Sequence, residues 1–284
     1  MNWDLFTVQL RNELLKLFAR KRTYLGFVVF LLTELVVLCL WQRPFLFKPI
    51  QSLLANNGLL LEDYNGGLSL ACFILVLTVG LVASLYLTLV GGDLVAKEME
   101  EGTIRMVLAR PVSRAQLFAI KALTGVVHTF ILMLFIGLSS LLAGLLFQQG
   151  PGQLLVFAPL QKVFATYDAA EGLWRYLGAV VLMSLTYQAV SALALMCSCL
   201  RLRPATATVL SLSVLYVDFA LTSIPFLATQ KHWFFSHHLS CWVLTLRYFP
   251  PWHQIVTSLL ILTGLTVSFW TIGLACFCAR DIKN

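Results

Sequence analysis

Six apolar stretches, each long enough to cross a bilayer, constrain the fold of this chain more than any other feature. A transmembrane helix needs about 20 predominantly apolar residues. Because lipid offers no hydrogen-bond partners, a stretch of this kind must satisfy its backbone internally and therefore folds as a helix. We place the spans at residues 24–41, 68–90, 117–147, 176–200, 205–227 and 255–279. The sequence thus predicts an all-α polytopic membrane protein, built as a single domain over residues 1–284.

Composition supports the same fold class and excludes others. The chain is 59% hydrophobic and 12% charged, whereas soluble domains carry about 25% charged residues. No segment remains that could form a soluble domain, so any catalytic domain must lie in the bilayer or in a partner chain. The net charge of +7 could suggest nucleic acid, but the basic residues flank the apolar spans, where membrane orientation explains them better. We therefore expect lipid, and no nucleic acid, as a partner.

Two further segments are expected to lie along the membrane surface. Residues 1–23 repeat apolar side chains at three- and four-residue spacing among basic ones, which predicts an amphipathic helix in the interface. Residues 233–249 are apolar too, but His237, His238 and Arg247 leave no uninterrupted run that could span. We interpret 228–254 as an extracytoplasmic interfacial or re-entrant element with an aromatic belt.

The distribution of Lys and Arg predicts the orientation. With the N-terminus inside, 14 of the 20 basic residues fall on the cytoplasmic side and six on the other. Cytoplasmic segments carry this excess of positive charge in membrane proteins. The expected location is therefore the cell inner (plasma) membrane, crossed several times, with both termini in the cytoplasm.

The stretch 91–121 is the only long polar run with internal order, and we call it the elbow. Its first part, from Asp93 to Glu101, can continue the preceding helix into water, with Asp93 and Lys97 as an i,i+4 ion pair. Gly102 then offers a C-terminal cap in the left-handed conformation. The first helix of the elbow is thus expected to end at Gly102.

The second part of the elbow predicts a short crossing helix and the start of a long one. Thr103 can cap the short helix, and Pro111 ends it by disfavouring α geometry in the residue before it. Ser113 and Gln116 form an S-x-x-Q capping box that starts the next helix. A simple solvated loop would account for the charges alone, but it needs neither two caps nor a helix breaker, so we favour a docking surface.

The motif from Glu98 to Arg114, with its E-G-T and R-P-V-S-R sequences, resembles the signature of type-2 ABC transporter permeases. The resemblance extends weakly to the whole chain in length, span count and the Arg-Asp-Ile ending. It implies a permease subunit of an ATP-driven transporter, with export as the expected direction. It also implies that two permease chains, identical or paralogous, pair on two ATPase subunits, and that the elbow docks on the ATPase. The residues that would make this contact are Glu98, Glu101, Gly102, Thr103, Arg105, Leu108, Arg110, Pro111, Ser113 and Arg114.

The sequence contains no nucleotide-binding or hydrolase motif. Neither G-x-x-x-x-G-K-[ST] nor C-x-x-C, H-E-x-x-H or G-x-S-x-G occurs. We expect no cofactor and no enzymatic activity in this chain, with ATP and Mg²⁺ bound by the partner subunit. Four histidines and Cys241 gather near the 228–254 element, but without a repeated spacing we expect no metal site there.

Three ionisable residues, Glu34, His128 and Asp218, lie inside predicted spans. A charged carboxylate facing lipid is costly, so each should face the protein interior, a partner or a path. We expect them, and Asp218 in particular, to line a substrate path or subunit interface; structural hydrogen bonds between helices are the alternative. The competing functional classes are a membrane-embedded enzyme that uses these three residues, and a non-transporting scaffold or immunity-type protein. An enzyme would require the three side chains to converge within hydrogen-bond reach.

Overall fold

The computed structural model describes residues 3–41, 66–104, 113–148, 150–161 and 163–279. Within them, six helical segments are long and apolar enough to cross a membrane, as predicted. The first, third, fifth and sixth spans are the helices α2, α7, α10 and α12. The second span comprises α4, η2 and α5, and the fourth comprises α8 and α9. Their bounds are Lys21–Trp41 (α2), Gly67–Thr78 (α4), Val79–Ala83 (η2), Ser84–Glu100 (α5), Arg114–Phe147 (α7), Ala169–Thr186 (α8), Gln188–Cys199 (α9), Pro204–Ser223 (α10) and Trp252–Ala279 (α12).

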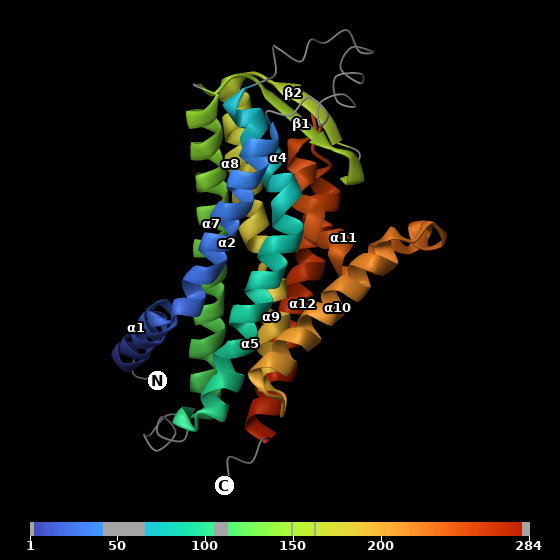
Figure 1. Cartoon of the computed structure of the whole chain (residues 1–284). Coiled ribbons are helices and arrows are strands. Elements are labelled where there is room, and N and C mark those ends of the chain that lie inside the picture. The colour runs from blue at the N-terminus through green and yellow to red at the C-terminus, as the bar shows by residue number, and fades with distance from the viewer. Residues whose placement is uncertain (1–2, 42–65, 105–112, 149, 162, 280–284) are drawn as a thin grey trace.

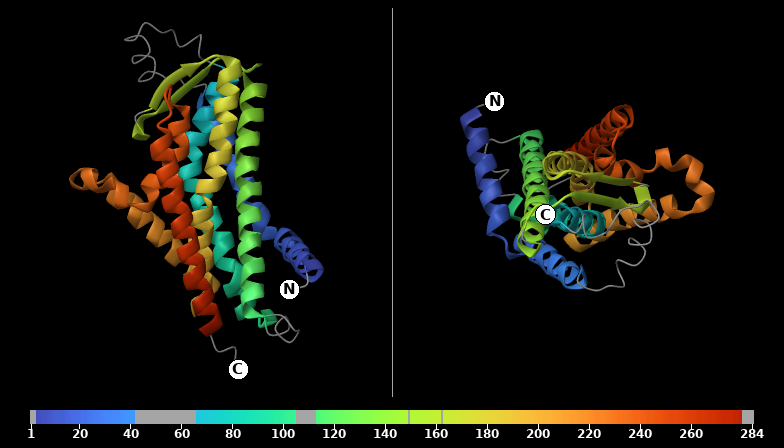
Figure 2. Two further views of the ribbon diagram at one scale, coloured as in Figure 1. Left: turned by 180° about the vertical axis from the view of Figure 1, so that it is seen from behind. Right: turned by 90° about the horizontal axis from the view of Figure 1, so that it is seen from above.

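The helices form one elongated bundle with two different ends (Figure 1). One end carries the end of α5, the start of α7 and the end of α12, and we call it the elbow end. The other carries a two-stranded β-hairpin, and we call it the hairpin end. Figure 2 shows both termini of the chain near the elbow end. A chain that crosses the membrane an even number of times must have both termini on the same side.

An amphipathic helix, α1 (Trp3–Ala19), precedes the first span and lies against the side of the bundle near the elbow end, next to α7 (Figures 1 and 2). It meets α2 at a sharp turn around Arg20, where the Thr23 hydroxyl donates to the Leu17 carbonyl at 2.5 Å. Leu17 is buried, whereas Val8 and Leu15 are exposed. One face of α1 therefore packs on the bundle, and the opposite face carries the apolar side chains available to lipid.

Two spans are interrupted near mid-height, which the apolar pattern did not predict. In the second span, α4 and α5 are joined by a single π-helical turn, η2. In the fourth, α8 ends at Thr186 and α9 begins at Gln188, with Tyr187 between them. By contrast, α7 runs for 34 residues and α12 for 28 without interruption.

The hairpin end is covered by a β-hairpin that the sequence reading did not anticipate. Strands β1 (Leu154–Ala158) and β2 (Val163–Tyr167) pair antiparallel around the short 3-10 turn η3 (Pro159–Gln161), with Val156 opposite Ala165. Buried residues in β2 alternate with residues that are exposed or half-buried, so the strand has one face on the bundle. The sequence itself does not show a strict apolar/polar alternation here, because the exposed residue Phe164 is as apolar as its buried neighbours.

The segment after α10 folds back toward the bundle through short helical turns. These are η4 (Pro225–Trp233), α11 (Phe235–Leu239) and η5 (Ser240–Leu246). Figure 1 shows α10 leaving the bundle obliquely, with η4 at its far tip and α11 returning toward α12. The expected 228–254 element is therefore a chain of short turns that packs partly against the bundle, where Trp242 and Leu246 are buried.

Candidate functional site

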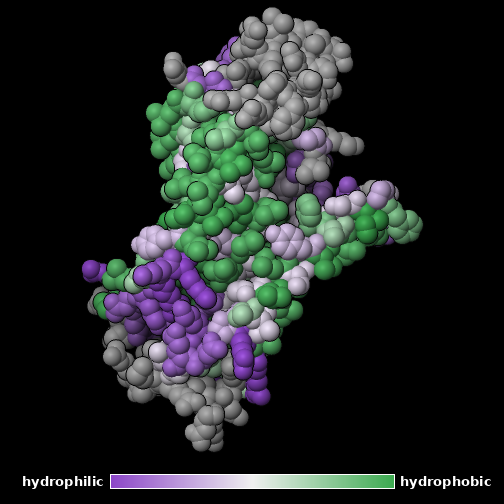
Figure 3. Space-filling view, in the orientation of Figure 1, coloured by the Kyte–Doolittle hydropathy of each residue, from purple (hydrophilic) through white to green (hydrophobic). Residues whose placement is uncertain are grey.

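Polar side chains gather at the elbow end of the molecule. Figure 3 shows hydrophilic residues concentrated over α1 and the neighbouring helix ends, while the surface of the bundle above them is mostly apolar. An apolar band beside a charged end is the surface of a membrane protein at its water interface. The elbow begins and ends within this charged end.

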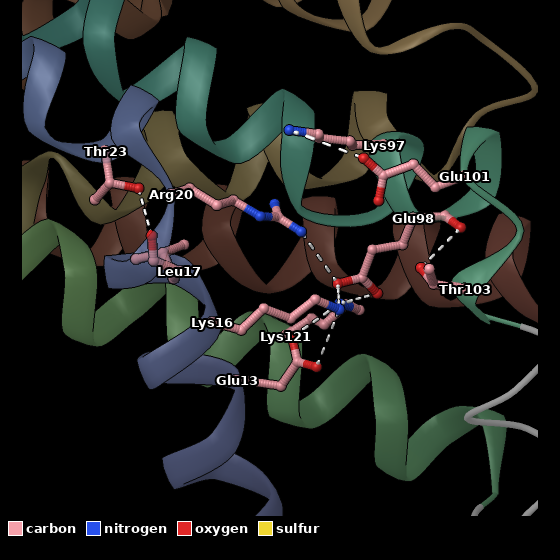
Figure 4. A network of polar contacts seen from close by, with 10 residues as sticks. All are labelled: Glu13, Lys16, Leu17, Arg20, Thr23, Lys97, Glu98, Glu101, Thr103 and Lys121. Atoms are coloured by element: carbon pink, nitrogen blue, oxygen red, sulfur yellow. Dashed lines mark hydrogen bonds and ion pairs between the residues drawn. The ribbon is translucent and has the colours of Figure 1, made fainter.

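The centre of the polar region is the carboxylate of Glu98, near the end of α5 (Figure 4). Its Oε1 accepts from the Lys16 ammonium and lies 3.5 Å from Arg20 Nη2. Its Oε2 lies 2.7 Å from Lys121 Nζ. One buried carboxylate on α5 thus contacts two cations from the α1 region and one from α7.

A second carboxylate, from Glu13 on α1, completes the cluster. Its Oε2 lies 3.0 Å from Lys121 Nζ, and its Oε1 lies 4.0 Å from Lys16 Nζ. The five side chains carry three positive and two negative charges. Glu98 and Lys121 are almost fully buried, whereas Lys16 and Arg20 are partly exposed. A buried charge is tolerated only when it is paired, so Glu98 and Lys121 need each other.

The cluster holds three elements together just where the elbow leaves the bundle. We call these five residues the Glu98 cluster: Glu13, Lys16, Arg20, Glu98 and Lys121. The sequence motif predicted that Glu98 belongs to the ATPase contact, but it gave no reason to place Glu13, Lys16 or Arg20 in a site. Their spacing at i, i+3 and i+7 places all three on one face of a helix, and that was the available signal.

A second ion pair involves Asp93, which precedes Glu98 by between one and two turns on α5. Arg22 Nη1 donates to Asp93 Oδ2 at 3.1 Å. The expected i,i+4 ion pair of Asp93 with Lys97 is therefore wrong, because the Asp93 carboxylate pairs with Arg22 of α2 instead. Lys97 instead lies 4.0 Å from Glu101 Oε1, one turn later on the same helix.

The first half of the elbow has the predicted C-terminal cap at Gly102, whereas the N-cap role of Thr103 stays a prediction, because the N–H groups that its hydroxyl would accept from lie outside the described residues. Gly102 has φ of +71°, the left-handed conformation expected for it. The Thr103 hydroxyl donates to the Glu98 carbonyl at 3.3 Å, which ties the start of the next turn to the end of α5. Ile104 is buried. The predicted coupling residues Arg105, Leu108, Arg110 and Pro111 lie outside the described residues.

The second half of the elbow leads directly into α7. Ser113 Oγ accepts from the Gln116 backbone N–H at 3.2 Å, so Ser113 is the N-cap as predicted. The Gln116 side chain does not complete the capping box but donates to Gln9 Oε1 on α1 at 3.1 Å. Arg114 Nη1 donates to the Cys278 carbonyl at the end of α12, at 2.8 Å. The end of the elbow is thus fixed to both α1 and α12.

Glu34 and His128 are both buried, but they lie at different heights of the bundle. Glu34 lies beside Ser140 of α7, and its Oε1 has no hydrogen-bond partner among the described residues. The His128 ring packs near Phe18 and Tyr86, with centroid distances of 6.3 and 5.7 Å. Ser140 follows His128 by twelve positions on α7, a rise of about 18 Å.

Asp218 makes a helix cap in the structure. Its Oδ1 accepts from Phe235 N at 3.1 Å and its Oδ2 from Ser236 N at 2.6 Å, the first backbone N–H groups of α11. Carboxylates stabilise helix N-termini in this position. In the described part of the chain no hydrogen bond joins any two of Glu34, His128 and Asp218. The convergence that a membrane-embedded enzyme would need is not seen among them.

The histidines near the hairpin end are not arranged around a metal position. The two ring nitrogens of His238 are 3.0 Å from Ser258 Oγ and 2.9 Å from the His232 carbonyl oxygen. Burial lowers the pKa of His237, and the nearby His238 and Lys231 lower it further. Among the described residues no three His, Cys, Asp or Glu side chains lie close enough together to hold a metal ion.

The comparisons with known proteins agree with the membrane architecture. A family model described as ABC-2 family transporter protein matches residues 10–282. That range covers all six spans, the elbow and all five residues of the Glu98 cluster. No curated protein matches the chain.

Proposed function

The chain belongs to the ABC-2 transporter family, and on that premise we propose that it is a permease subunit whose elbow docks on a separate ATPase subunit. The six apolar helices and the family membership indicate a multi-pass membrane protein that takes part in transport. The proposal adds where the energy of ATP hydrolysis enters. It also assigns ATP and Mg²⁺ to the partner, because the chain lacks a Walker motif.

The observation that supports the proposal is that polar contacts hold the elbow to neighbouring helices. A loop that only connects two spans needs no fixed position, but here both ends of the elbow are anchored. The Glu98 cluster ties its beginning to α1 and α7, and Arg114 and Gln116 tie its end to α12 and α1. Rigid elements transmit a displacement, whereas a mobile loop absorbs it. The anchored elbow is therefore suited to pass a push from the ATPase to four helices at once.

The orientation in the membrane follows from the same assignment. The excess of basic residues at the elbow end and at both termini favours the cytoplasmic side for that end. An ATPase in the cytoplasm can then reach the elbow. We propose the plasma membrane as the location and export as the direction of transport, the latter on the resemblance to the family alone.

A second permease chain, identical or paralogous, is the proposed partner within the membrane. The far face of α10 is apolar and exposed at Val209, Val217 and Phe219. The helix packs against α5, α9 and α11, and these three side chains point away from its buried residues, so a second chain can cover this face. Disulfide-linked dimers of a Val217→Cys variant would support that pairing, and monomers alone under oxidising conditions would count against it.

The test of docking compares two charge reversals at opposite ends of the molecule. Glu101 is exposed and pairs with Lys97 one turn away, and Glu171 is exposed and pairs with Arg175 one turn away. Exposed pairs of this kind contribute about 0–1 kcal/mol, so neither reversal should unfold the protein. Glu101→Lys should weaken co-purification of the ATPase and its stimulation, whereas Glu171→Lys should not. Equal effects of the two variants, or no co-purifying ATPase for the wild type, would refute the proposal.

A further inference from the structure

The two interruptions in the second and fourth spans lie next to each other. Ser84 is the first residue of α5 after the π-turn, and the Tyr187 side chain comes within hydrogen-bonding reach of it. Tyr187 is the residue between α8 and α9, with φ of −74° and ψ of −5°. Two independent breaks in neighbouring helices thus share one level of the bundle.

Neither break is imposed by proline, because none occurs in residues 67–100 or 169–199. Kinks without proline arise at π-bulges, at glycine, or where side chains compete for backbone groups. Gly80 lies in the π-turn, and hydroxyls beside both breaks donate to backbone carbonyls of their own helices. Thr78 donates to Ile74 at 2.6 Å, and Thr186 donates to Met183 at 2.9 Å. The local sequence therefore favours irregular helix at both places.

The half-helices on the hairpin side of this level are held in place. Ser69 at the start of α4 donates to the Gln153 carbonyl and accepts from Leu155 N, both at 2.8 Å, which fixes α4 to β1. Arg175 at the start of α8 lies 4.3 Å over the Tyr167 ring and donates to the Arg247 carbonyl at 2.7 Å. The hairpin and η5 thus hold the outer halves of both broken spans.

The half-helices on the elbow side form a close pair of their own. A Cβ on Gly91 of α5 would lie only 2.6 Å from the Ala194 Cβ of α9, so the two backbones approach as closely as glycine permits. α5 also carries Glu98 and the beginning of the elbow. Any force on the elbow therefore acts on a packed pair of helices that ends at the two breaks.

From these observations we propose that η2 and Tyr187 form a hinge, about which α5 and α9 swing together while α4 and α8 stay fixed. The proposal rests on the proposed function, since the ATPase would drive the swing through the elbow. α7 and α12 cross the level without a break, so the swing must stretch the Lys121 contact with Glu98 at the base of α7 and shift α9 along α12. π-turns within helices are frequent at functional positions, which agrees with such a role.

The size of the motion follows from the length of the lever. From Ser84 to Glu100 the helix α5 is about 24 Å long, so a tilt of roughly 10° would move its end by about 4 Å. Spin labels can measure this displacement in the complete complex. A label pair at Glu100 and Leu142 spans the hinge, whereas a pair at Leu77 and Leu142 lies wholly on the hairpin side of it. All three positions are exposed.

Alanine scanning of glycines supplies matched variants, because three helical glycines share the same open surroundings. A Cβ at Gly80, Gly178 or Gly264 would have no neighbour within 4 Å. Only Gly80 lies in a break, whereas Gly178 is inside α8 and Gly264 inside α12. Alanine reduces backbone freedom in each case without a clash. The Gly80→Ala variant should therefore stiffen the hinge, and the other two should serve as controls.

The first experiment needs no partner. The reference segment is the part of α7 around Val126, whose carbonyl accepts from the Gln188 side chain at the same level of the bundle. In the purified permease, backbone deuterium uptake at residues 79–84 and 187–191 should be at least several-fold faster than in that segment. Gly80→Ala should slow the uptake at 79–84, and Gly178→Ala and Gly264→Ala should not. Uptake at the breaks as slow as in α7 would overturn the hinge, whether or not an ATPase binds.

The second experiment uses the permease with its ATPase. On ATP turnover the distance from position 100 to position 142 should change by the component of the roughly 4 Å displacement that lies along the line between the two labels. The distance from 77 to 142 should stay constant, and Gly80→Ala should reduce the change. If the complex hydrolyses ATP but both distances change equally, or neither changes, the hinge is wrong while the docking proposal stands. If no ATPase binds at all, the docking proposal fails and the exchange experiment alone decides the hinge.

Discussion

Neutralising Glu98 is the most informative single change in the Glu98 cluster. In the Glu98→Gln variant, Lys121 loses a carboxylate oxygen 2.7 Å away, although its own side chain is only 1% exposed. Removing one partner of a buried ion pair costs about 3–5 kcal/mol, because the other charge stays buried. Glu13 remains 3.0 Å from Lys121, and Lys16 and Arg20 are partly exposed and can turn to water. The expected loss is therefore at the lower end, about 3 kcal/mol of unfolding free energy.

A double substitution tests whether this loss comes from the unpaired charge. Glu98→Gln combined with Lys121→Gln removes both buried charges and leaves two amides that can bond to each other. Replacing a buried pair as a whole is often close to neutral, so the double variant should lie within about 1 kcal/mol of the wild type. The coupling energy of the cycle, which is the summed cost of the two single variants minus the cost of the double variant, should then be at least about 2 kcal/mol.

Unfolding of the purified variants in detergent micelles measures these differences. Glu101→Gln is the matched control, since Glu101 is exposed and lies 4.0 Å from Lys97, and it should cost less than about 0.5 kcal/mol. If the double variant is as unstable as the sum of the two single variants, the buried pair does not hold α5 to α7. The anchored elbow would then lose its structural basis.

Three further changes probe other parts of the account. Gly102→Val places a β-branched residue at φ +71°, which costs about 1–2 kcal/mol, and it should lower ATPase stimulation in reconstituted complexes without preventing membrane insertion. Asp218→Leu removes the acceptor for the first two N–H groups of α11 and should cost about 1–2 kcal/mol in thermal unfolding, more than Asp218→Asn; a transport defect in a stable Asn variant would instead place the carboxylate on the path. Gly144→Ala puts a Cβ 2.2 Å from the Gly67 carbonyl oxygen and should destabilise by about 1–3 kcal/mol, whereas Gly178→Ala, with open space around it, should stabilise by about 0.4–1 kcal/mol.

The apolar pattern predicted the helical architecture because lipid leaves the backbone no other choice. The span boundaries agree to within a few residues except at the two long interrupted helices. The caps of the elbow were also readable, since Gly102 and Ser113 act through local backbone chemistry. These features depend on a few neighbouring residues and need no knowledge of tertiary structure.

The rest depends on contacts between distant parts of the chain. Glu13 lies 108 positions from Lys121, and nothing local shows that the two meet. Asp93 illustrates the same limit, because Arg22 from another helix displaces the expected local partner Lys97. The break at Tyr187 has no proline or glycine to signal it. Long-range pairing and irregular helix are thus the features that apolar periodicity cannot reveal.

Photo-cross-linking from two exposed positions tests most directly whether the elbow is the ATPase contact. A photoreactive residue at Glu101 lies on the elbow, and one at Trp174, which is 76% exposed, lies near the hairpin end. In membranes that contain the active complex, docking at the elbow predicts a cross-link to the ATPase from position 101 and none from position 174. A cross-link from position 174, or none from position 101 while the complex hydrolyses ATP, would contradict it.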